Sequence, residues 1–434
     1  MVRRCSSPKR EGSFFPDKLA FVIIYPMSHI SMPIFSEDIF SDSAIANPYP
    51  VYAKMRAQGQ IVWLETHEIW AAVGYQAAAD ILRQSKIFIS GRGLSLNDKV
   101  NQHLIGSTLN SDGERHSRQR RVTATAIMPD KLEELAPFIH KAADDTVKHL
   151  VQAKRCDGVA DFARILPLSI VTELIGLPAS GKQKMLEWAE ATFNLFEGFN
   201  ERSDASFKKL VDLQHYLKKH GTADQLEHGG LAKRIFEQAP EHGFSPEEAS
   251  QMMRDYINPS LDTTISAAAF MLYYLATEPK QWDRLRADPD LISNAVEEIV
   301  RLTTPIRGLS RFVAEDTEIC GIEMKEGQRV LVLFASANRD EAIFPEPDKF
   351  DVTRKTHRHM GFGQGIHMCM GMHLARMELQ QLLSALIRHV DSIELAGAAK
   401  IAMNNTIRGL SSLPVILSSQ KAGSYPASRF IGEK

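Results

Sequence analysis

The amino-acid sequence predicts a mainly α-helical fold, in which a large helical domain carries small β-sheets on one side. Helical periodicity dominates from about Asp130 onward. Strand-like patterns occur in two places: Gln60–Tyr75, which alternates like a hairpin, and about Arg311–Leu333, where glycines interrupt short runs. No internal repeat or low-complexity linker divides the 434 residues. We therefore expect a single domain over residues 31–434.

The composition is that of a globular protein without the bulk charge that a polyanionic partner needs. Hydrophobic residues make up 44% of the chain, and 51 Lys and Arg nearly balance 53 Asp and Glu, for a net charge of -2. We therefore expect no nucleic acid and no membrane as a partner. The four cysteines form no CxxC pair, which favours a reducing cytoplasm over a disulfide framework; they are Cys5, Cys156, Cys320 and Cys369.

The first 30 residues differ from the rest of the chain. Basic residues precede the apolar run Leu19–Tyr25, which is far shorter than the roughly 20 residues that a membrane-spanning helix needs. Pro26 ends this run, and no small-residue cleavage site of a signal peptide follows. We expect residues 1–30 to be a disordered leader or a mis-started segment, with Met27 as the natural first residue.

The first helix that bears on function begins at Ser245. Ser245 at the N-cap, Pro246 at the first helical position and Glu248 three residues after the cap form a strong start signal. The helical pattern then continues to about Ala276. Pro259 lies inside it and lacks a backbone donor, so the helix should bend or open there. Polar residues adjoin this defect, namely Ser260, Asp262, Thr263 and Thr264.

Two further amphipathic helices follow. One covers residues 290–302, and its apolar face is flanked by Glu298 and Arg301, three positions apart on the helix surface. Taken alone, such a pair is usually solvated. The other starts around Met370 and has a buried stripe of Ala375, Leu379, Leu382 and Leu386.

Cys369 stands in the glycine-rich segment GFGQGIHMCMG, residues 361–371, just before the last of these helices. The positive end of a helix dipole favours an anion, so we expect this thiol to ionise readily. A thiolate in such a loop serves as a nucleophile or as a metal ligand. A nucleophile would need a base such as His367, and a zinc site would draw on His359, His367 and His373. A haem iron needs only one axial thiolate.

The same segment carries a specific resemblance. Phe362 to Gly371 resembles the FxxGxHxCxG loop of the bacterial cytochrome P450 monooxygenases at every fixed position. LDTT at residues 261–264 is similar to the oxygen-activating stretch of that family, and Glu298 to Arg301 is similar to its ExxR motif. The resemblance covers nearly everything after Pro48. It implies the P450 fold and a haem-thiolate monooxygenase.

The resemblance also implies roles for individual residues. Cys369 would ligate the iron of haem b, iron protoporphyrin IX, while Asp262 and Thr263 would be the acid-alcohol pair that supplies protons. Glu298 and Arg301 would form a buried brace for the cysteine loop. The haem propionates would be held by His116, Arg120, Arg311 and His367, and the loop around the haem would include Phe362, Gly363 and Gly371.

Two departures from the family pattern are visible. Pro259 and Ser260 stand where the family has Ala-Gly before the acid-alcohol pair, which predicts an altered oxygen groove. Lys349 stands where an arginine often completes a triad with Glu298 and Arg301, so we expect a looser brace.

The chain has no nucleotide fingerprint and no iron-sulfur cysteine cluster, so its electrons should come from a separate protein. The resemblance implies a ferredoxin with an NAD(P)H-dependent ferredoxin reductase. A local basic patch for docking is expected from Arg115, Arg118, Arg121, Lys355 and Arg358. The alternative is a haem-thiolate peroxygenase or a ligand sensor without a monooxygenase cycle, and the Asp262-Thr263 pair argues against both.

The segment FISGRGLSLND, Phe88–Asp98, resembles a loop of bacterial enzymes that oxidise para-substituted benzoates. Arg92 and Ser95 would then hold the acid end of a small aromatic substrate, packed by Phe193 or Phe196. We expect hydroxylation or O-demethylation at the opposite end of the ring, with O2 as the oxidant.

Overall fold

The structure is a computed structural model that describes residues 32–419, apart from 125–126, 177–180, 182–183, 199, 227–229 and 258. The expected leader, residues 1–30, lies outside the described residues. Of the helices that the structure describes, none has the length and the apolar character needed to cross a membrane.

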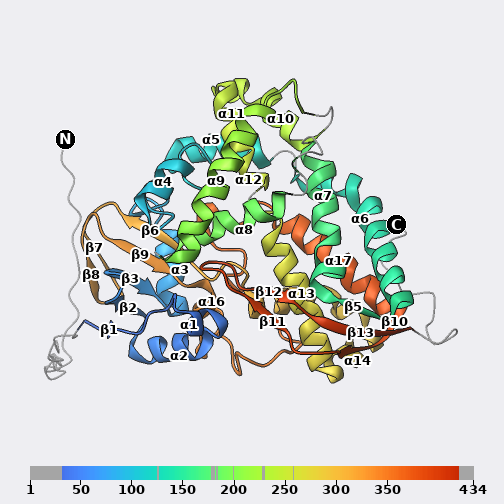
Figure 1. Cartoon of the computed structure of the whole chain (residues 1–434). Coiled ribbons are helices and arrows are strands. Elements are labelled where there is room, and N and C mark those ends of the chain that lie inside the picture. Colours follow the sequence, from blue (N-terminus) through green and yellow to red (C-terminus); the bar gives the residue numbers. More distant parts are fainter. Residues whose placement is uncertain are drawn as a thin grey trace, which may run out of the picture. The chain divides into compact units, whose positions relative to one another are not determined.

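Helices form most of the described chain, as the sequence predicts (Figure 1). They are α1 (Asp42–Ala46), α2 (Tyr49–Gln58), α3 (Tyr75–Arg83), α4 (Asp98–Leu104), α5 (Gly113–Ala124), α6 (Pro129–Ala153), α7 (Ile165–Ile175), α8 (Met185–Phe196), α9 (Glu201–His220), α10 (Leu231–Gln238), α11 (Pro246–Met252), α12 (Arg254–Ile257), α13 (Asp262–Thr277), α14 (Pro279–Ala287), α15 (Ile292–Thr303), α16 (Phe334–Ala337) and α17 (Met372–His389).

A six-stranded sheet contains both of the strand regions that the sequence predicts. Its order is β1 (Ile34–Phe35), β2 (Ile61–Leu64), β3 (Ile69–Ala72), β9 (Arg329–Val332), β6 (Leu309–Val313) and β4 (Phe88–Ile89). Strands β2 and β3 form the expected antiparallel hairpin, with Trp63 opposite Trp70. The short pair β7 (Thr317–Ile319) and β8 (Ile322–Met324) turns at Cys320 and Gly321, which both have positive φ.

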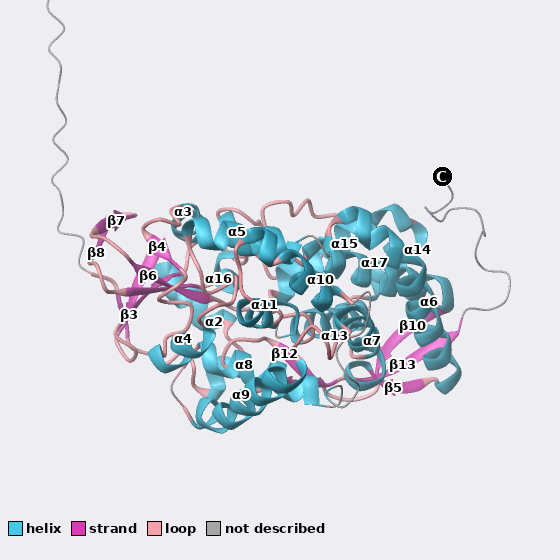
Figure 2. Ribbon diagram, turned by 90° about the horizontal axis from the view of Figure 1, so that it is seen from above, coloured by secondary structure: helices cyan, strands magenta, loops and turns pink. Residues whose placement is uncertain are grey.

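The C-terminal part of the chain adds strands that the sequence patterns did not predict. Strand β10 (Val390–Leu395) pairs with β13 (Pro414–Ser419), which pairs with β5 (Arg155–Asp157), and β11 (Lys400–Ala402) pairs with β12 (Gly409–Ser412). Figure 2 shows the β5–β13–β10 sheet at the opposite end of the helices from the six-stranded sheet. These strands are short and lack a sustained alternation of apolar and polar residues, so their partners define them.

The predicted opening at Pro259 is confirmed, because α13 starts only at Asp262, but the expected continuity before it is wrong, since the chain forms α11 and α12 there. The capping box at Ser245 is present, so the predicted start is confirmed. Near Pro259 the helix is interrupted, and side chains take over its backbone partners. Ser260 donates to the carbonyl of Tyr256, and Thr263 donates to that of Pro259 over 2.7 Å.

The main core brings α15 and α17 against α13. Ile299 and Leu302 of α15 are buried in the same apolar cluster as Leu382 and Leu386 of α17. The two predicted helices are therefore confirmed, although α17 begins at Met372, two residues later than expected. This packing fixes the helix that follows the Cys369 loop against the helix that carries Thr263.

Candidate functional site

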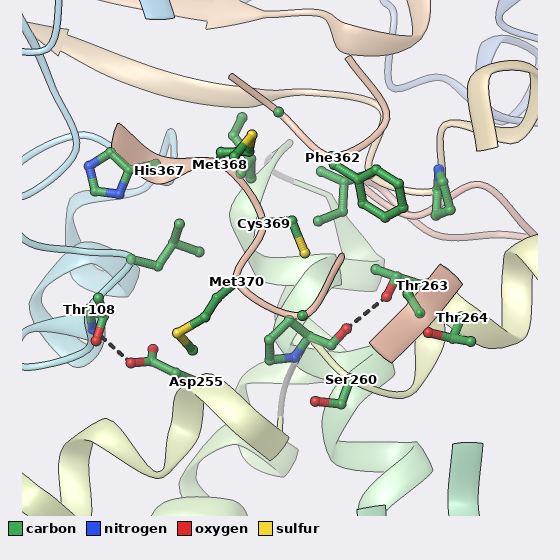
Figure 3. Close-up of a pocket in the computed structure, with 18 of the residues that line it drawn as sticks. Thr108, Asp255, Ser260, Thr263, Thr264, Phe362, His367, Met368, Cys369 and Met370 are labelled. Atoms are coloured by element: carbon green, nitrogen blue, oxygen red, sulfur yellow. Dashed lines mark hydrogen bonds between the residues drawn. The ribbon is translucent and has the colours of Figure 1, made fainter. Parts of the chain in front are cut away.

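The Cys369 loop is closed by its own backbone. Gly363 and Gly365 have φ of 67° and 73°, a left-handed conformation that favours glycine. The backbone N–H of Cys369 donates to the carbonyl of Phe362 over 2.8 Å. Figure 3 shows the sulfur of Cys369 in an interior cavity, with Phe362 on one side and Met370 on the other.

The cavity has a volume of about 270 Å³ and is lined mostly by apolar side chains. Its walls come from distant parts of the chain: the Cys369 loop, α13 with Thr263 and Thr264, and α8 with Phe193 and Phe196. Cys369 and Thr263 therefore line the same cavity, although they are 106 positions apart in the sequence.

The thiol of Cys369 does not ionise readily in the chain by itself, so that prediction is wrong. Burial raises the pKa of Cys369, and this outweighs the N–H of Gly371 and the charges of Arg120 and Arg376, which lower it. Helix α17 starts three residues after Cys369. The loss of hydration destabilises the thiolate more than the hydrogen bond from one backbone N–H stabilises it.

Four nitrogen-bearing side chains line the cavity beside the loop. His116 and Arg120 come from α5, Arg311 from β6 and His367 from the loop itself. The two imidazole rings lie 4.2 Å apart between centroids, and the Nε2 atoms of both are buried without a hydrogen-bond partner. Asp112 Oδ1 lies 4.0 Å from His367 Nε2, which is too far for a hydrogen bond.

Burial also lowers the pKa values of these side chains. It lowers the pKa of His367 to about 2, with help from Arg311 and His116, and lowers that of Arg311 to about 10. Cations and unsatisfied donors held together without an anion are costly. The arrangement therefore suits a ligand that brings carboxylates into the cavity.

Glu298 and Arg301 form the buried brace that the resemblance implies. Both side chains are fully buried, and Arg301 reaches the two carboxylate oxygens of Glu298 over 2.7 and 2.9 Å. Arg354 completes the triad, because its Nε lies 3.0 Å from Glu298 Oε1. The expectation for Lys349 is wrong: its ammonium pairs with exposed Glu346 instead.

The neighbouring residue Glu297 ties α15 to both ends of the cysteine loop. Its carboxylate contacts His359 Nε2 at 2.8 Å and Arg376 Nε at 2.6 Å. The two partners lower the pKa of Glu297 to about 2 against the opposing effect of burial. His359 is thus engaged away from Cys369, and no three His, Cys, Asp or Glu side chains gather as a metal-binding group within the described residues.

Asp262 and Thr263 are the first two residues of α13, and only one of them lines the cavity. Thr263 lines it, whereas Asp262 is not among the lining residues. Burial raises the pKa of Asp262 to about 8, and Glu190 adds to the rise while Arg164 opposes it. Asp262 is therefore protonated at neutral pH, one residue away from a hydroxyl group in the cavity.

The comparison with known families decides which class of protein carries the Cys369 loop: a cysteine nucleophile enzyme, a zinc protein or a haem protein. The family model described as cytochrome P450 matches residues 174–411, more than half of the chain. The chain belongs to the cytochrome P450 family. The protein is thus a P450 monooxygenase, and its cofactor is haem b. Cys369 as the axial ligand of the haem iron is a proposal that the position of its sulfur in the cavity supports.

Individual P450s match over nearly their whole length. Cytochrome P450 CYP199A2 of Rhodopseudomonas palustris is 34% identical over 393 residues, which cover 90% of this chain and 94% of the relative. Cytochrome P450 monooxygenase PikC of Streptomyces venezuelae is 29% identical over 398 residues, which cover 89% and 94%. The solved structure of cytochrome P450 CREJ in complex with (4-ethylphenyl) dihydrogen phosphate superposes with a TM-score of 0.78, at 26% identity, over 90% of this chain and 100% of that one.

The residues of this P450 fit a haem. The sulfur of Cys369 faces the cavity, and the unpartnered His116 and His367 line it with Arg120 and Arg311, so these four side chains would hold the two propionates. A Cβ placed on Gly371 would meet no atom within 4 Å, which leaves open space beside the sulfur. The propionate roles remain a proposal that these orphaned atoms support.

The expected substrate contacts divide into two groups. Phe193 and Phe196 line the cavity, edge to face, with ring centroids 5.5 Å apart. Arg92 and Ser95 do not line it. Arg92 is exposed and its guanidinium lies 4.1 Å above the ring of Phe312, while the hydroxyl of Ser95 donates to the carbonyl of Leu195.

Sequence reasoning missed three acidic or basic residues of this P450. Glu297 was not singled out beside the ExxR motif, and Arg354 was passed over in favour of Lys349. Glu378, which lines the cavity from α17, is three positions after Ala375, so its place beside the buried stripe was a readable signal.

Proposed function

We propose that this P450 inserts one oxygen atom from O2 into a small para-substituted aromatic acid, by hydroxylation or O-demethylation. The observation that carries the proposal is the cavity, in which the sulfur of Cys369, the hydroxyl group of Thr263 and two phenylalanines meet. Phe193 and Phe196 offer an apolar, edge-to-face wall for a flat ring. Such a wall suits a small aromatic substrate better than a long flexible one.

A solved relative supports an anionic ring as the substrate class. The CREJ structure contains (4-ethylphenyl) dihydrogen phosphate, a para-substituted ring with an acidic group. That protein is 26% identical to this chain and is covered in full by it. We extend the ring and the acid to this chain as a proposal, with a carboxylate as the acid.

Each protein residue has a defined part in the reaction. When bound, the haem iron activates dioxygen, and thiolate ligation favours cleavage of the O–O bond. Thr263 holds a hydroxyl group in the cavity and is fastened to the Pro259 carbonyl by a bond of 2.7 Å. Asp262 holds a proton next to it, because burial keeps its carboxyl group neutral. Together they pass protons toward the site of oxygen reduction.

The acid end of the substrate requires a movement of Arg92. An exposed cation–π contact such as that of Arg92 on Phe312 is worth only about 0.5–1 kcal/mol. A hydrogen bond to a charged group contributes about 1.5–3 kcal/mol. We therefore propose that a carboxylate bound in the cavity draws Arg92 away from Phe312, because the charged hydrogen bond is the stronger of the two interactions.

The test is a spectral titration of the haem-loaded protein with 4-methoxybenzoate and with its neutral methyl ester. We expect the acid to bind more tightly than the ester, and Arg92→Ala to weaken acid binding by about 10- to 100-fold. Arg83→Ala is the matched control, because Arg83 is exposed and pairs with Asp80 on the surface of α3. Equal binding of acid and ester by the wild type, or unchanged acid binding by Arg92→Ala, contradicts the proposal.

A ferredoxin supplied by its NAD(P)H-dependent reductase is the proposed electron donor. Arg120 donates to the carbonyl of Met368 over 2.6 Å, so α5 lies directly against the cysteine loop. Exposed Arg121 on α5 and exposed Lys355 and Arg358 before the loop form a basic surface suited to an acidic partner. Arg115 and Arg118 contribute less, because they bind Glu248 and the carbonyl of His242.

Turnover separates this function from that of a peroxygenase or a sensor. With NADH, a surrogate ferredoxin and its reductase, a monooxygenase forms oxygenated product from 4-methoxybenzoate. A peroxygenase forms product only when peroxide is added, and a sensor changes its spectrum without forming product. The same measurement with salt added checks the basic surface, since screening should slow electron transfer.

A further inference from the structure

Thr108 contributes to the cavity wall a hydroxyl group that lacks a hydrogen-bond partner. The residue lines the cavity and is 6% exposed, and its Oγ1 is buried with no partner among the described residues. The hydroxyl of the neighbouring Ser107 differs, because it donates to the carbonyl of Leu104 over 3.0 Å. A buried hydroxyl without a partner is costly, so we expect the partner of Thr108 Oγ1 to be a group that enters the cavity.

Asp255 of α12 brings a carboxylate to the same part of the wall. It lines the cavity, and Figure 3 shows it beside Thr108, on the other side of the Cys369 sulfur from Thr263. The backbone N–H of Thr108 donates to Asp255 Oδ2 over 3.0 Å. A carboxylate has about four acceptor positions, so this bond leaves Asp255 able to accept a further donor from the cavity.

The charge of Asp255 is not neutralised by an ion pair with Arg254, the residue before it. The guanidinium of Arg254 donates instead to the carbonyls of His103 and Ile105, over 2.6 and 2.9 Å. Burial raises the pKa of Asp255 to about 6, while Thr108, Arg254 and the backbone N–H of Leu109 lower it. Asp255 is therefore mostly ionised at pH 7, and a carboxylate in an apolar wall is stable only when donors reach it.

A ring hydroxyl group complements both members of this pair. It can donate its proton to the carboxylate of Asp255 and accept the proton of the Thr108 hydroxyl. A carboxylate fits poorly, because it would meet the negative charge of Asp255, and an ammonium group has no lone pair for the Thr108 proton. The acid end of the substrate proposed above therefore lies elsewhere in the cavity.

We propose that Thr108 and Asp255 form a subsite that recognises a hydroxyl group on the ring of the substrate. The inference rests on the proposed function for the aromatic ring, but it does not depend on the carboxylate. The subsite holds the hydroxylated edge of the ring beside α12, across the cavity from Thr263 (Figure 3). It thus orients the ring as well as selecting it.

The test is a spectral titration of the haem-loaded protein that needs no turnover. The ligands are 4-ethylbenzoate and its derivatives with a hydroxyl group at ring position 2 or 3, each as the acid and as the methyl ester. The measured quantity is the hydroxyl preference, defined as the dissociation constant of the plain ligand divided by that of its better-bound hydroxylated derivative. The wild type should show a preference of at least about tenfold in both series, because the hydrogen bond is made to a charged group. A preference near one in both series overturns the inference.

Variants separate recognition of the hydroxyl group from a role in shaping the wall. Thr108→Val keeps the shape and the backbone N–H that binds Asp255, so it should lower the hydroxyl preference about three- to tenfold, and Thr108→Ser should restore it. Asp255→Asn keeps an acceptor for that N–H but loses the charge, and it should lower the preference about threefold or more. Ser107→Ala is the matched control, because it removes from the same wall a hydroxyl that is already bound to Leu104, and it should leave the preference unchanged.

A purely structural pair would weaken the binding of plain and hydroxylated ligands equally when it is changed. An unchanged hydroxyl preference in both Thr108→Val and Asp255→Asn therefore refutes the subsite. The two proposals can fail separately in the same titrations. Esters that bind as tightly as the acids contradict the proposed recognition of a carboxylate, whereas a hydroxyl preference that persists among the esters still supports the subsite.

Discussion

Arg354 donates from Nε to Oε1 of Glu298 over 3.0 Å, across 56 residues of sequence. The guanidinium also reaches the carbonyls of Pro345 and Glu346 with its two terminal nitrogens. Arg354 therefore joins a fully buried carboxylate to the segment that leads into the cysteine loop. The brace has two arginines, as the family pattern has, but the second one comes from a position five residues beyond Lys349.

Arg354→Ala should lower the free energy of unfolding by about 1–3 kcal/mol, because Glu298 loses a charged hydrogen bond while fully buried. Lys349→Ala is the control and should change it by less than about 1 kcal/mol, since both partners of the Lys349–Glu346 pair are exposed. Urea unfolding of the haem-loaded proteins measures both values. Equal losses for the two variants would show that Lys349 belongs to the brace after all.

Cys369→Ala should abolish the red-shifted carbon monoxide band of the reduced protein, because no second thiol lines the cavity within the described residues. Cys156 is buried in the main core and Cys320 is exposed at the β7–β8 turn. Absorbance spectra of the reduced, CO-treated variant measure the band. A variant that kept it would require another axial ligand.

Thr263→Ala should bind substrate as the wild type does but divert electrons into hydrogen peroxide. The hydroxyl of Thr263 lines the cavity and is held by the Pro259 carbonyl, so its loss interrupts the path from Asp262. Peroxide formed per NADH consumed is the measurement, and Thr263→Ser is the control that retains the hydroxyl. Unchanged coupling would mean that Ser260 or Thr264 performs the transfer.

Glu297→Gln should destabilise the protein at neutral pH and have little effect in acid. The pKa of Glu297 is lowered from 4.5 to about 2 in the folded state, so its contribution is complete above about 4.5 and is lost as pH falls toward 2. The shift corresponds to about 2–4 kcal/mol. Unfolding free energies of wild type and variant at several pH values test this, and a difference that grows as pH falls would refute it.

Local features of the fold were readable from the sequence because they depend on neighbouring residues. The capping box at Ser245 joins residues three positions apart, and the hairpin of β2 and β3 follows from alternation over a few residues. The FGQGIHMCMG segment likewise identified the thiolate loop, since its glycines and Cys369 are adjacent in the chain. Periodicity also identified α15 and the buried stripe of α17.

Contacts between distant residues were not readable in this way. The sequence offered both Lys349 and Arg354 to Glu298, and only the path of residues 345–354 selects Arg354. The sequence also predicts Arg92 as a substrate contact, but it could not show that the packing of β4 against β6 sets its guanidinium on Phe312.

By itself, then, the sequence determined the class of chemistry and the helices that flank the cysteine loop, because each rests on short-range patterns of shape and hydrogen bonding. The tertiary structure alone decided which acids keep their protons. Asp262 and Glu378 have pKa values raised to about 8 because distant helices exclude water from them. Desolvation is a property of everything that surrounds a group, and no local stretch of sequence contains it.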